Sequence, residues 1–380
     1  MKPLSDYRRL FPILDRTNYL NSNSMGAMPA AVGDALQEYA REWATDGVDA
    51  WDHWMPMMSE VADLAGRFFN AEPGSVMLNQ NVSYFEASIA SCMDFTPKRN
   101  KVVLAGLEFP TVLYVWERFR KYGAELEIVG SDDGIDIPLE RILDAIDERT
   151  VIVPISHSYY VSSALVDIAA IVRKAHSVGA MVMADIYQTA GVMPIDVQAW
   201  DVDFAVGGSH KWLCGGPGTC FLYVQPKIRE RFEPRVTGWF GHAAPFAFEP
   251  PPIRYGEGAW RFMGGTPAIP AYFGARAAYR ILLEVGVERI REQNRLLTGR
   301  LIAAATDAGL NVHTPVEPAR RAGFVAVDFP GADRALKTLV SERYKLDYRP
   351  NCGLRIGPHF YNTPEEIDRF VTRARQLAGR

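Results

Sequence analysis

The chain has few cysteines and no long apolar run. Its 380 residues include four cysteines, at positions 92, 214, 220 and 352, with no C-x-x-C pair and no Cys/His cluster of zinc-finger spacing. This pattern predicts no metal site, and it favours free thiols in a reducing compartment. No stretch approaches the roughly 20 apolar residues that cross a bilayer. Charges interrupt residues 1–20 throughout, so no signal segment is expected.

The chain also lacks a basic stripe, an internal repeat and a low-complexity tract. Its formal net charge is -4 and its pI is about 6.0, which argues against a nucleic-acid partner. No G-x-G-x-x-G follows a first strand, which disfavours a Rossmann-like nucleotide enzyme. Hydrophobic residues make up 48% and charged residues 23%, an ordinary globular balance. We expect a soluble cytoplasmic protein, away from membranes, with two unequal domains.

Short apolar runs alternate with amphipathic stretches through the middle of the chain. Strands alternating with helices predict an α/β fold, with a mainly parallel sheet flanked by helices. In such sheets ligands bind beyond the carboxyl ends of the strands, so the residues after each run are the candidates for chemistry. The predicted strands are 101–105, 124–129, 151–156, 181–184 and 204–207, and the predicted helices are 111–122, 139–147 and 168–178.

A Pro- and Gly-rich stretch at residues 245–270 predicts an irregular connection that leaves the large domain. Helical patterns at 272–283, 287–308, 332–343 and 365–376, with a strand at 323–328, then predict a smaller C-terminal α+β domain. We divide the chain into an N-terminal segment that contacts the active site (1–25), a large cofactor-binding domain (26–265) and a small domain (266–380).

Two residues near the centre of the chain suggest a specific chemistry. Asp185 follows the apolar run MVMA, and Lys211 lies in the segment GGSHKW after the next predicted strand. A pyridoxal cofactor requires an amine for a Schiff base and a carboxylate that keeps its ring nitrogen protonated. An isolated Asp is more often a helix cap, and an isolated Lys a surface residue. The glycines and the apolar strand around this pair favour the catalytic interpretation.

Residues 184–219 resemble the class V aminotransferase superfamily, which has the PLP fold type I. The branch is the one that contains kynureninase, cysteine desulfurase and isopenicillin-epimerase-like enzymes, and the resemblance covers most of the chain. It implies pyridoxal 5'-phosphate as cofactor and a role for each matching residue. Lys211 would form the Schiff base, Asp185 would face the pyridine nitrogen, Gln188 would lie near the phenolic oxygen, and Ser209 and His210 would lie near the phosphate.

The same resemblance places the phosphate and the ring of the cofactor. The segment NQNV lies between a predicted strand (75–78) and a predicted helix (83–95). Backbone N–H groups near Asn81 and Val82 would bind the phosphate at the helix N-terminus. Asn81 could also serve only as a helix cap. Phe109, which follows the strand 101–105, matches the aromatic residue that stacks on the pyridine ring.

Two later motifs imply a dimer and a substrate contact. Thr266 matches the threonine of the family's G-T loop, which reaches the phosphate of a neighbouring subunit, so the resemblance implies a homodimer with shared active sites. The alternative is a simple turn before a helix. Arg355 opens a segment similar to the family's R-x-x-P-x-x-Y-N motif. It would bind the substrate α-carboxylate, because a guanidinium forms two parallel hydrogen bonds with a carboxylate.

Residues 19–26 and 238–242 resemble kynureninase segments near the substrate, so Ser24, Trp239 and His242 are predicted substrate contacts. Two positions depart from kynureninases, which carry His at position 188 and Tyr at position 210. The pair found here is typical of desulfurases and epimerase-like members. Cys352 lies too close to the arginine motif for the nucleophilic loop of a desulfurase, and we interpret it as a structural thiol.

We therefore expect a PLP-dependent enzyme that acts on a free L-amino acid by kynureninase-like cleavage of a side-chain bond. One alternative is a class V aminotransferase, epimerase or lyase of a specialised pathway, including decarboxylation or oxidative deamination. Another is a catalytically silent binding protein with the same fold. The residues indicate the cofactor more strongly than the reaction.

Overall fold

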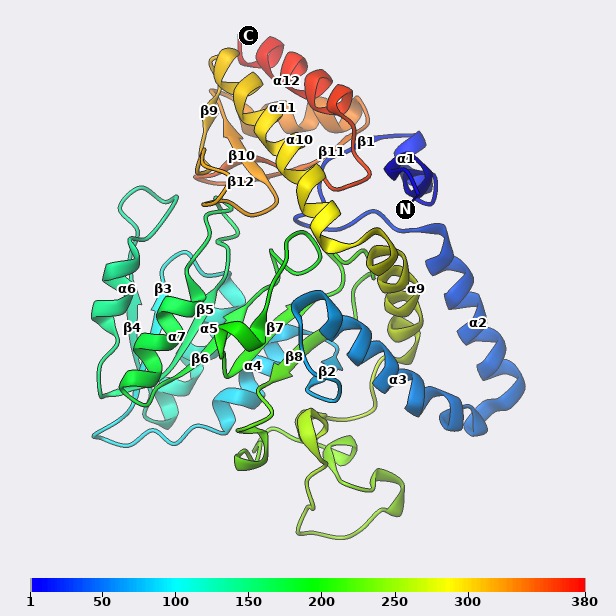
Figure 1. Ribbon diagram of the computed structural model, residues 1–380, viewed down its shortest axis with the longest axis vertical. Helices are drawn as coiled ribbons and strands as arrows, with labels where there is room; N and C mark the ends of the chain where they lie inside the picture. The colour runs from blue at the N-terminus through cyan, green and yellow to red at the C-terminus, as the bar shows by residue number, and fades with distance from the viewer. Residues whose placement is uncertain (1, 380) are drawn as a thin grey trace.

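The computed structural model describes residues 2–379, in which the largest element is a seven-stranded sheet (Figure 1). The strand order is β2-β8-β7-β6-β5-β3-β4, and neighbours from β7 to β4 are parallel, which confirms the predicted mainly parallel sheet. β8 runs antiparallel to β7 and β2. The strands are β2 (Val76–Asn79), β3 (Lys101–Ala105), β4 (Glu125–Val129), β5 (Thr150–Ser156), β6 (Met181–Asp185), β7 (Phe204–Gly208) and β8 (Cys220–Val224).

The central strands are continuous apolar runs because both faces of the sheet are covered. Every residue of β3, β5 and β7 is buried. The parallel strands β3, β5, β6 and β7 end at one edge of the sheet. Their last residues are Ala105, Ser156, Asp185 and Gly208. Loops that leave this edge converge on one region, as expected for an α/β sheet.

Helices cover the sheet, and the predicted ones are present. α7 begins at Asp167, whose side chain accepts a hydrogen bond from the Ala170 N–H. α12 begins with a reciprocal capping box between Thr363 and Glu366. Within residues 2–379, no helix has both the length and the apolar character needed to span a membrane. The helices of the larger part are α1 (Leu4–Arg8), α2 (Ala30–Asp46), α3 (Trp51–Gly66), α4 (Val82–Ser91), α5 (Pro110–Arg118), α6 (Leu139–Ala145), α7 (Ile168–Ser177) and α8 (Val197–Trp200).

The strand β8 has no counterpart in the sequence prediction, which ended the large sheet at residue 207. The loop between β7 and β8 turns back on itself, and the Ser209 N–H donates to the Thr219 carbonyl. Gly216 and Gly218 have φ of +76° and +102°, which favour glycine and allow this return. The loop carries Lys211, so the antiparallel strand fixes both ends of the lysine segment.

A smaller antiparallel sheet lies beyond the carboxyl edge of the large one (Figure 1). Its order is β12-β13-β10-β9, and the short strands β1 and β11 pair beside it. α2, α3 and α9 lie side by side near β2, and α10 continues from α9 into the smaller layer (Figure 1). The elements are α9 (Ile269–Val285), α10 (Val287–Asp307), α11 (Ala332–Ser341), α12 (Pro364–Ala378), β1 (Asn18–Tyr19), β9 (Asn311–Val312), β10 (Val325–Asp328), β11 (Tyr344–Lys345), β12 (Asp347–Arg349) and β13 (Gly353–Ile356).

The buried apolar side chains form two clusters that meet along α10. Along α10, the larger cluster includes Ile290 and the smaller one begins at Leu297, while later residues such as Phe324 and Phe360 belong to the larger cluster. Leu20, from the N-terminal segment, belongs to the smaller cluster. The helix α9 packs with the larger cluster through one apolar face. The division of the chain at residues 265 and 266 stays a prediction.

Asn294 ties the two clusters together at the point where they meet. Its side chain is fully buried on α10, and its Nδ2 group donates to the carbonyls of Gly323 (2.7 Å) and Pro358 (2.8 Å). Replacing Asn294 by alanine leaves both carbonyls without this donor. We predict a loss of about 2–3 kcal/mol in the free energy of unfolding, measured by urea denaturation. Leu296→Ala, at an exposed position of the same helix, should change it by less than about 0.5 kcal/mol. Equal effects of the two substitutions would contradict this role.

Candidate active site

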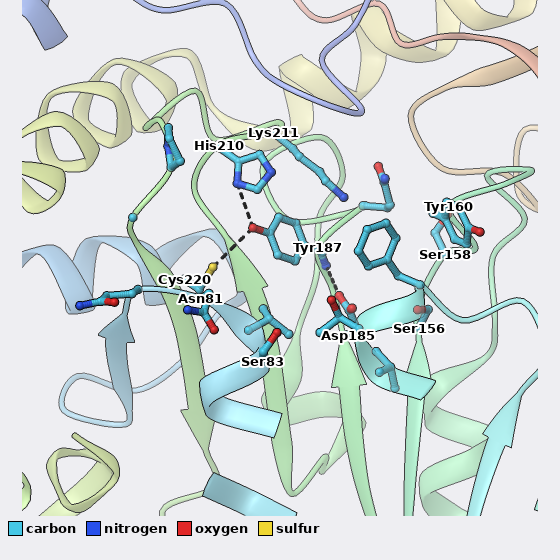
Figure 2. Close-up of a pocket in the computed structure, with 18 residues that line it drawn as sticks. Asn81, Ser83, Ser156, Ser158, Tyr160, Asp185, Tyr187, His210, Lys211 and Cys220 are labelled. Atoms are coloured by element: carbon cyan, nitrogen blue, oxygen red, sulfur yellow. Dashed lines mark hydrogen bonds between the residues drawn. The ribbon is translucent and has the colours of Figure 1, made fainter. Parts of the chain in front are cut away.

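A cavity of about 310 Å³ opens at the carboxyl edge of the large sheet (Figure 2). Its wall combines the ends of β5 and β6, the start of α4, the segment that leads into α5, and the loop between β7 and β8. Seven of the residues predicted from sequence line it together: Asn81, Val82, Phe109, Asp185, Gln188, His210 and Lys211. The other lining residues are Gln80, Ser83, Thr111, Val112, Ser156, Ser158, Tyr160, Tyr187, Pro217, Gly218 and Cys220.

Lys211 and Asp185 influence each other across this cavity. Burial lowers the pKa of the Lys211 amine to about 8, and the nearby Asp185 charge opposes that shift. Burial raises the pKa of Asp185 to about 6, against the Tyr187 N–H hydrogen bond and the charge of Lys211. The Tyr187 N–H donates to Asp185 Oδ1 at 2.8 Å. At neutral pH the amine therefore exchanges readily between its charged and neutral forms, as a nucleophile or base must.

The N-terminus of α4 faces the cavity through Asn81, Val82 and Ser83 (Figure 2). Asn81 caps the helix, because its Oδ1 atom accepts from the Tyr84 N–H at 2.9 Å. The first backbone N–H groups of a helix have no partner within the helix, and its dipole favours an anion there. Asn81 can therefore both cap the helix and lie at a phosphate site, since a cap and an anion site share this geometry.

Phe109 and Gln188 contribute an aromatic and an amide surface. Phe109 is 44% exposed, and its ring makes an edge contact with Tyr160 at 5.2 Å between ring centroids. Exposure of this ring makes it available to a ligand. The Gln188 amide is held from two sides, because Nε2 donates to the Asn23 carbonyl (3.0 Å) and Oε1 accepts from Trp212 Nε1 (3.2 Å). The first of these bonds also joins the N-terminal segment to the cavity wall.

Two buried carboxyl groups lie behind the cavity. Glu108 accepts from the N–H of Ser156 at 2.8 Å and from its hydroxyl. Glu86 accepts from Trp116 Nε1 at 2.6 Å. Burial raises the pKa of each carboxyl to about 8, and the charge of Asp185 contributes to the rise. Both groups are therefore mainly protonated at neutral pH.

Ser209 and Arg355 lie outside the cavity wall. Ser209 is fully buried, and its hydroxyl bonds to Tyr279 and accepts from Thr219 Oγ1 at 2.7 Å. Arg355 lies on β13 and is 3% exposed. Its Nε and Nη2 atoms donate to the two carboxylate oxygens of Asp347, at 3.0 and 2.5 Å, and Nη1 donates to the Tyr160 carbonyl at 2.8 Å. One edge of this guanidinium is thus already occupied.

Four further predicted residues do not line this cavity of the single chain. Thr266 is exposed, and Trp239 is 37% exposed within an aromatic cluster that includes Phe246. His242 is buried, and its Nδ1 atom accepts from the Ala244 N–H at 3.0 Å. Ser24 lies in a turn and donates its N–H to the Asn21 carbonyl. Their predicted roles in binding remain predictions.

The sequence analysis missed Tyr187, Cys220, Ser156 and Ser158 as parts of the cavity wall. Tyr187 could have been found, because it follows the end of a strand by two residues, where side chains of an α/β sheet meet ligands. Cys220 begins β8, the strand that was not predicted. The Ser158 hydroxyl is buried and has no protein partner, so it is available to a bound group.

Comparison with known proteins identifies the family. The family model of class-V aminotransferases matches residues 18–370. The uncharacterized aminotransferase YcbU of Bacillus subtilis (strain 168) is 31% identical over 95% of this chain and 94% of its own length. A kynureninase of Burkholderia pseudomallei (strain K96243) is 28% identical over 93% of this chain and 87% of its own.

Solved structures show the same fold at low identity. The apo cysteine desulfurase of Thermococcus onnurineus NA1 has a TM-score of 0.88 at 22% identity, and the match covers 100% of this chain and 99% of that one. A C-DES mutant with glycine covalently linked to its PLP cofactor has a TM-score of 0.89 at 20% identity, covering 97% and 98%. The fold is therefore PLP fold type I, as the sequence predicted.

The chain belongs to the class-V aminotransferase family, and its cofactor is pyridoxal 5'-phosphate. The cavity fits this cofactor by its own chemistry. It offers an amine for the aldehyde, a carboxylate for the ring nitrogen, a helix N-terminus for the phosphate and the unpaired hydroxyl of Ser158. It is also of a size that admits a small flat molecule.

The lowered pKa of Lys211 makes a prediction about its reactivity. Only the neutral amine attacks an aldehyde, so covalent capture of pyridoxal 5'-phosphate by the apoprotein should speed up with pH and level off above about 8. With an ordinary lysine, the rate of capture would continue to rise up to about pH 10.4. Stopped-flow absorbance over a pH series measures the rate. Lys211→Ala should lose the covalent band, whereas Lys227→Ala, at an exposed position, should leave the profile unchanged. A midpoint near pH 10 would contradict the assignment.

Proposed function

We propose that this protein is a PLP-dependent enzyme that cleaves a bond in the side chain of a free L-amino acid, in the manner of a kynureninase. The observation that carries the general proposal is the cavity that holds a buried amine and a buried carboxylate beside a helix N-terminus. The similarity to kynureninases, which spans about nine tenths of each chain, supports this branch of the family.

The proposed roles follow from the positions of the side chains. Lys211 would bind the cofactor covalently, and Asp185 would face its ring nitrogen. Phe109 would stack on the ring, and the N–H groups at Asn81 and Val82 would bind the phosphate. Gln188, His210 and Ser209 would complete this surface, with Ser209 acting through its hydrogen bonds because it does not reach the cavity.

The bound cofactor supplies an electron sink for the charge that develops at the substrate Cα. Lys211 would act as the general base that takes the Cα proton, and its pKa of about 8 suits that task. Asp185 would hold a negative charge opposite the ring nitrogen of the bound cofactor. Arg355 would orient the substrate through its carboxylate, using N–H groups that Asp347 and Tyr160 leave free.

The cysteines argue against sulfur transfer. Cys352 is buried, and its thiol donates to the Val161 carbonyl. Burial raises the pKa of the Cys352 and Cys92 thiols to about 12, so neither is a ready nucleophile. Cys214 is buried and does not line the cavity, and burial raises the pKa of Cys220, which does line it, to about 11. The desulfurase structures therefore support the fold of this chain and not its reaction.

A second candidate is a class V aminotransferase, epimerase or lyase, including decarboxylating or oxidative deamination chemistry. The similarity to YcbU, named as an aminotransferase, favours this alternative. A catalytically silent binding protein is the non-enzyme alternative. These three functions can be told apart by their products. A binding protein would hold the cofactor and turn over no amino acid.

Product identification separates these functions. We predict that the holoenzyme releases anthranilate from L-kynurenine, detected by fluorescence, and that Lys211→Ala releases none. The assay should be run against a panel of amino acids, with and without oxygen and with and without a keto-acid acceptor. Keto acid formed only with an acceptor would instead identify an aminotransferase. No turnover of any amino acid by a protein that retains the cofactor would identify the binding protein.

Substitution of Arg355 tests the proposed contact with the substrate carboxylate. We predict that Arg355→Ala raises KM about 10- to 100-fold, because hydrogen bonds to a charged group are lost, while the cofactor spectrum is unchanged. A double substitution with Asp347→Ala removes the carboxylate that would otherwise be left unpaired. Arg349→Ala is a matched control, since Arg349 also pairs with Asp347, at 2.9 Å. Loss of the cofactor spectrum in both Arg355 variants would contradict the assignment.

We also propose that the protein is a homodimer with shared active sites. Thr266, Trp239, His242 and Ser24 are predicted to contact ligands, yet none of them lines the cavity of the single chain. An exposed Thr266 and a half-exposed Trp239 could contribute to the cavity of a second subunit. Sedimentation of the purified protein would test this assembly.

A further inference from the structure

An aromatic side chain that the proposed roles leave unused lies in the centre of the cavity. Tyr187 follows the end of β6, and its ring lies below the end of the Lys211 side chain (Figure 2). The distance from Lys211 Nζ to the centroid of the Tyr187 ring is 4.3 Å, and to that of Phe109 it is 5.6 Å. Two aromatic rings therefore contact the same amine, and Tyr187 is the closer one.

Two hydrogen bonds fix the orientation of this ring. The Tyr187 hydroxyl lies 2.9 Å from His210 Nδ1 and 3.4 Å from Cys220 Sγ (Figure 2). His210 directly precedes Lys211, so the partner of the phenol belongs to the same loop as the amine. The ring is thereby tied at its hydroxyl end to the lysine loop and through its backbone to β6.

The neighbouring strand provides the space for this arrangement. A Cβ atom at Gly208, the last residue of β7, would lie 2.1 Å from the Tyr187 hydroxyl oxygen and 2.3 Å from Cζ. Real Cβ atoms essentially never approach so closely. A larger residue at position 208 would therefore force the Tyr187 ring to shift, and the glycine permits this close approach with no special backbone conformation. The position of Tyr187 depends on a second residue that is far from it in the sequence.

The protonation states of Tyr187 and His210 favour a role for the ring face of Tyr187. Burial raises the pKa of Tyr187 well above 10 and lowers the pKa of His210 to about 4, with the Lys211 charge adding to the second shift. Around neutral pH both groups are uncharged. The phenol and the imidazole thus share a hydrogen bond without adding a charge beside the amine.

We propose that Tyr187 is a positioning residue: its ring face holds the Lys211 amine, and with Phe109 it forms a two-ring aromatic surface for the flat cofactor, while His210, Cys220 and the missing side chain of Gly208 fix its orientation. This inference rests on the proposed role of Lys211. An aromatic face attracts an ammonium group and also favours contact with another flat ring. A side chain that only filled space could be replaced by any apolar group of similar volume.

The test is the dissociation constant and absorbance spectrum of pyridoxal 5'-phosphate bound to the full chain. Tyr187→Leu removes both the face and the hydroxyl, and it should weaken cofactor binding about tenfold and shift the absorbance maximum. Tyr187→Phe keeps the face, so it should bind within about threefold of the parent. Tyr114→Leu, at an exposed position of α5, is the matched control and should change neither quantity.

A double-mutant cycle with Gly208 provides a sharper test. Gly208→Ala should displace the Tyr187 ring and weaken cofactor binding about as much as Tyr187→Leu does. The double variant should bind about as tightly as Tyr187→Leu alone, because the two closest clashes of the added Cβ disappear with the ring and only the approach to Cys220 Sγ, at 2.9 Å, remains. Melting temperatures of the apoproteins show whether each variant folds, and the comparison of Tyr187→Phe with Tyr187→Leu remains decisive if Gly208→Ala does not.

The outcomes of the two proposals are distinguishable. Tyr187→Leu with parental affinity and spectrum would overturn the role of Tyr187 while leaving the covalent link to Lys211 intact. Equal weakening by the Phe and Leu substitutions would overturn the role of the ring face. Retention of the covalent absorbance band in Lys211→Ala would overturn the proposed role of Lys211 instead.

Discussion

The site depends on keeping an amine and a carboxylate together in a place from which water is largely excluded. Burial alone would neutralise both groups, since it lowers the pKa of Lys211 and raises that of Asp185. Each charge offsets part of the other's shift, so both groups titrate within about one unit of neutral pH. A sheet with parallel strand ends and a stiff return loop is needed to hold this pair, because neither residue could support its charge alone.

The groups behind the cavity determine where negative charge resides. The charge of Asp185 contributes to the raised pKa of Glu86 and Glu108, and each glutamate accepts a hydrogen bond from a neighbouring element. Their raised pKa values leave them mainly protonated at neutral pH, so the negative charge of the three carboxyl groups resides on Asp185. Of these three carboxyl groups, only Asp185 provides a strong negative charge, because like charges in a low-dielectric region repel.

The sequence predicted the parts of the site that are local and left out those that depend on pairing between distant strands. Apolar runs located β3, β5, β6 and β7 to within a residue or two, and hence Asp185. β8 was missed because the glycine-rich segment before it shows no hydrophobic periodicity. Cys220, the first residue of β8, was missed with it. The place of Tyr187 just after β6 could be predicted from the sequence, but its close contact with Gly208 could not, because that contact joins two different strands. The role that the resemblance implies for Thr266 is a contact with a second subunit, and it stays a prediction.

Arg355 has a hydrogen-bonding partner that its sequence motif does not predict, because the strand register places Asp347 opposite it. The sequence motif indicates an arginine free to bind a carboxylate, yet Asp347 lies directly opposite Arg355 in the β12–β13 pair and occupies the Nε edge of its guanidinium. The Nη1 group meanwhile donates to Tyr160, a residue of the cavity wall. The arginine thus links the smaller sheet to the cavity while one edge is held rigid. If Arg355 binds the substrate as proposed, the carboxylate would have to approach the remaining N–H groups or displace Asp347, and either requirement would narrow the orientations in which an amino acid can bind.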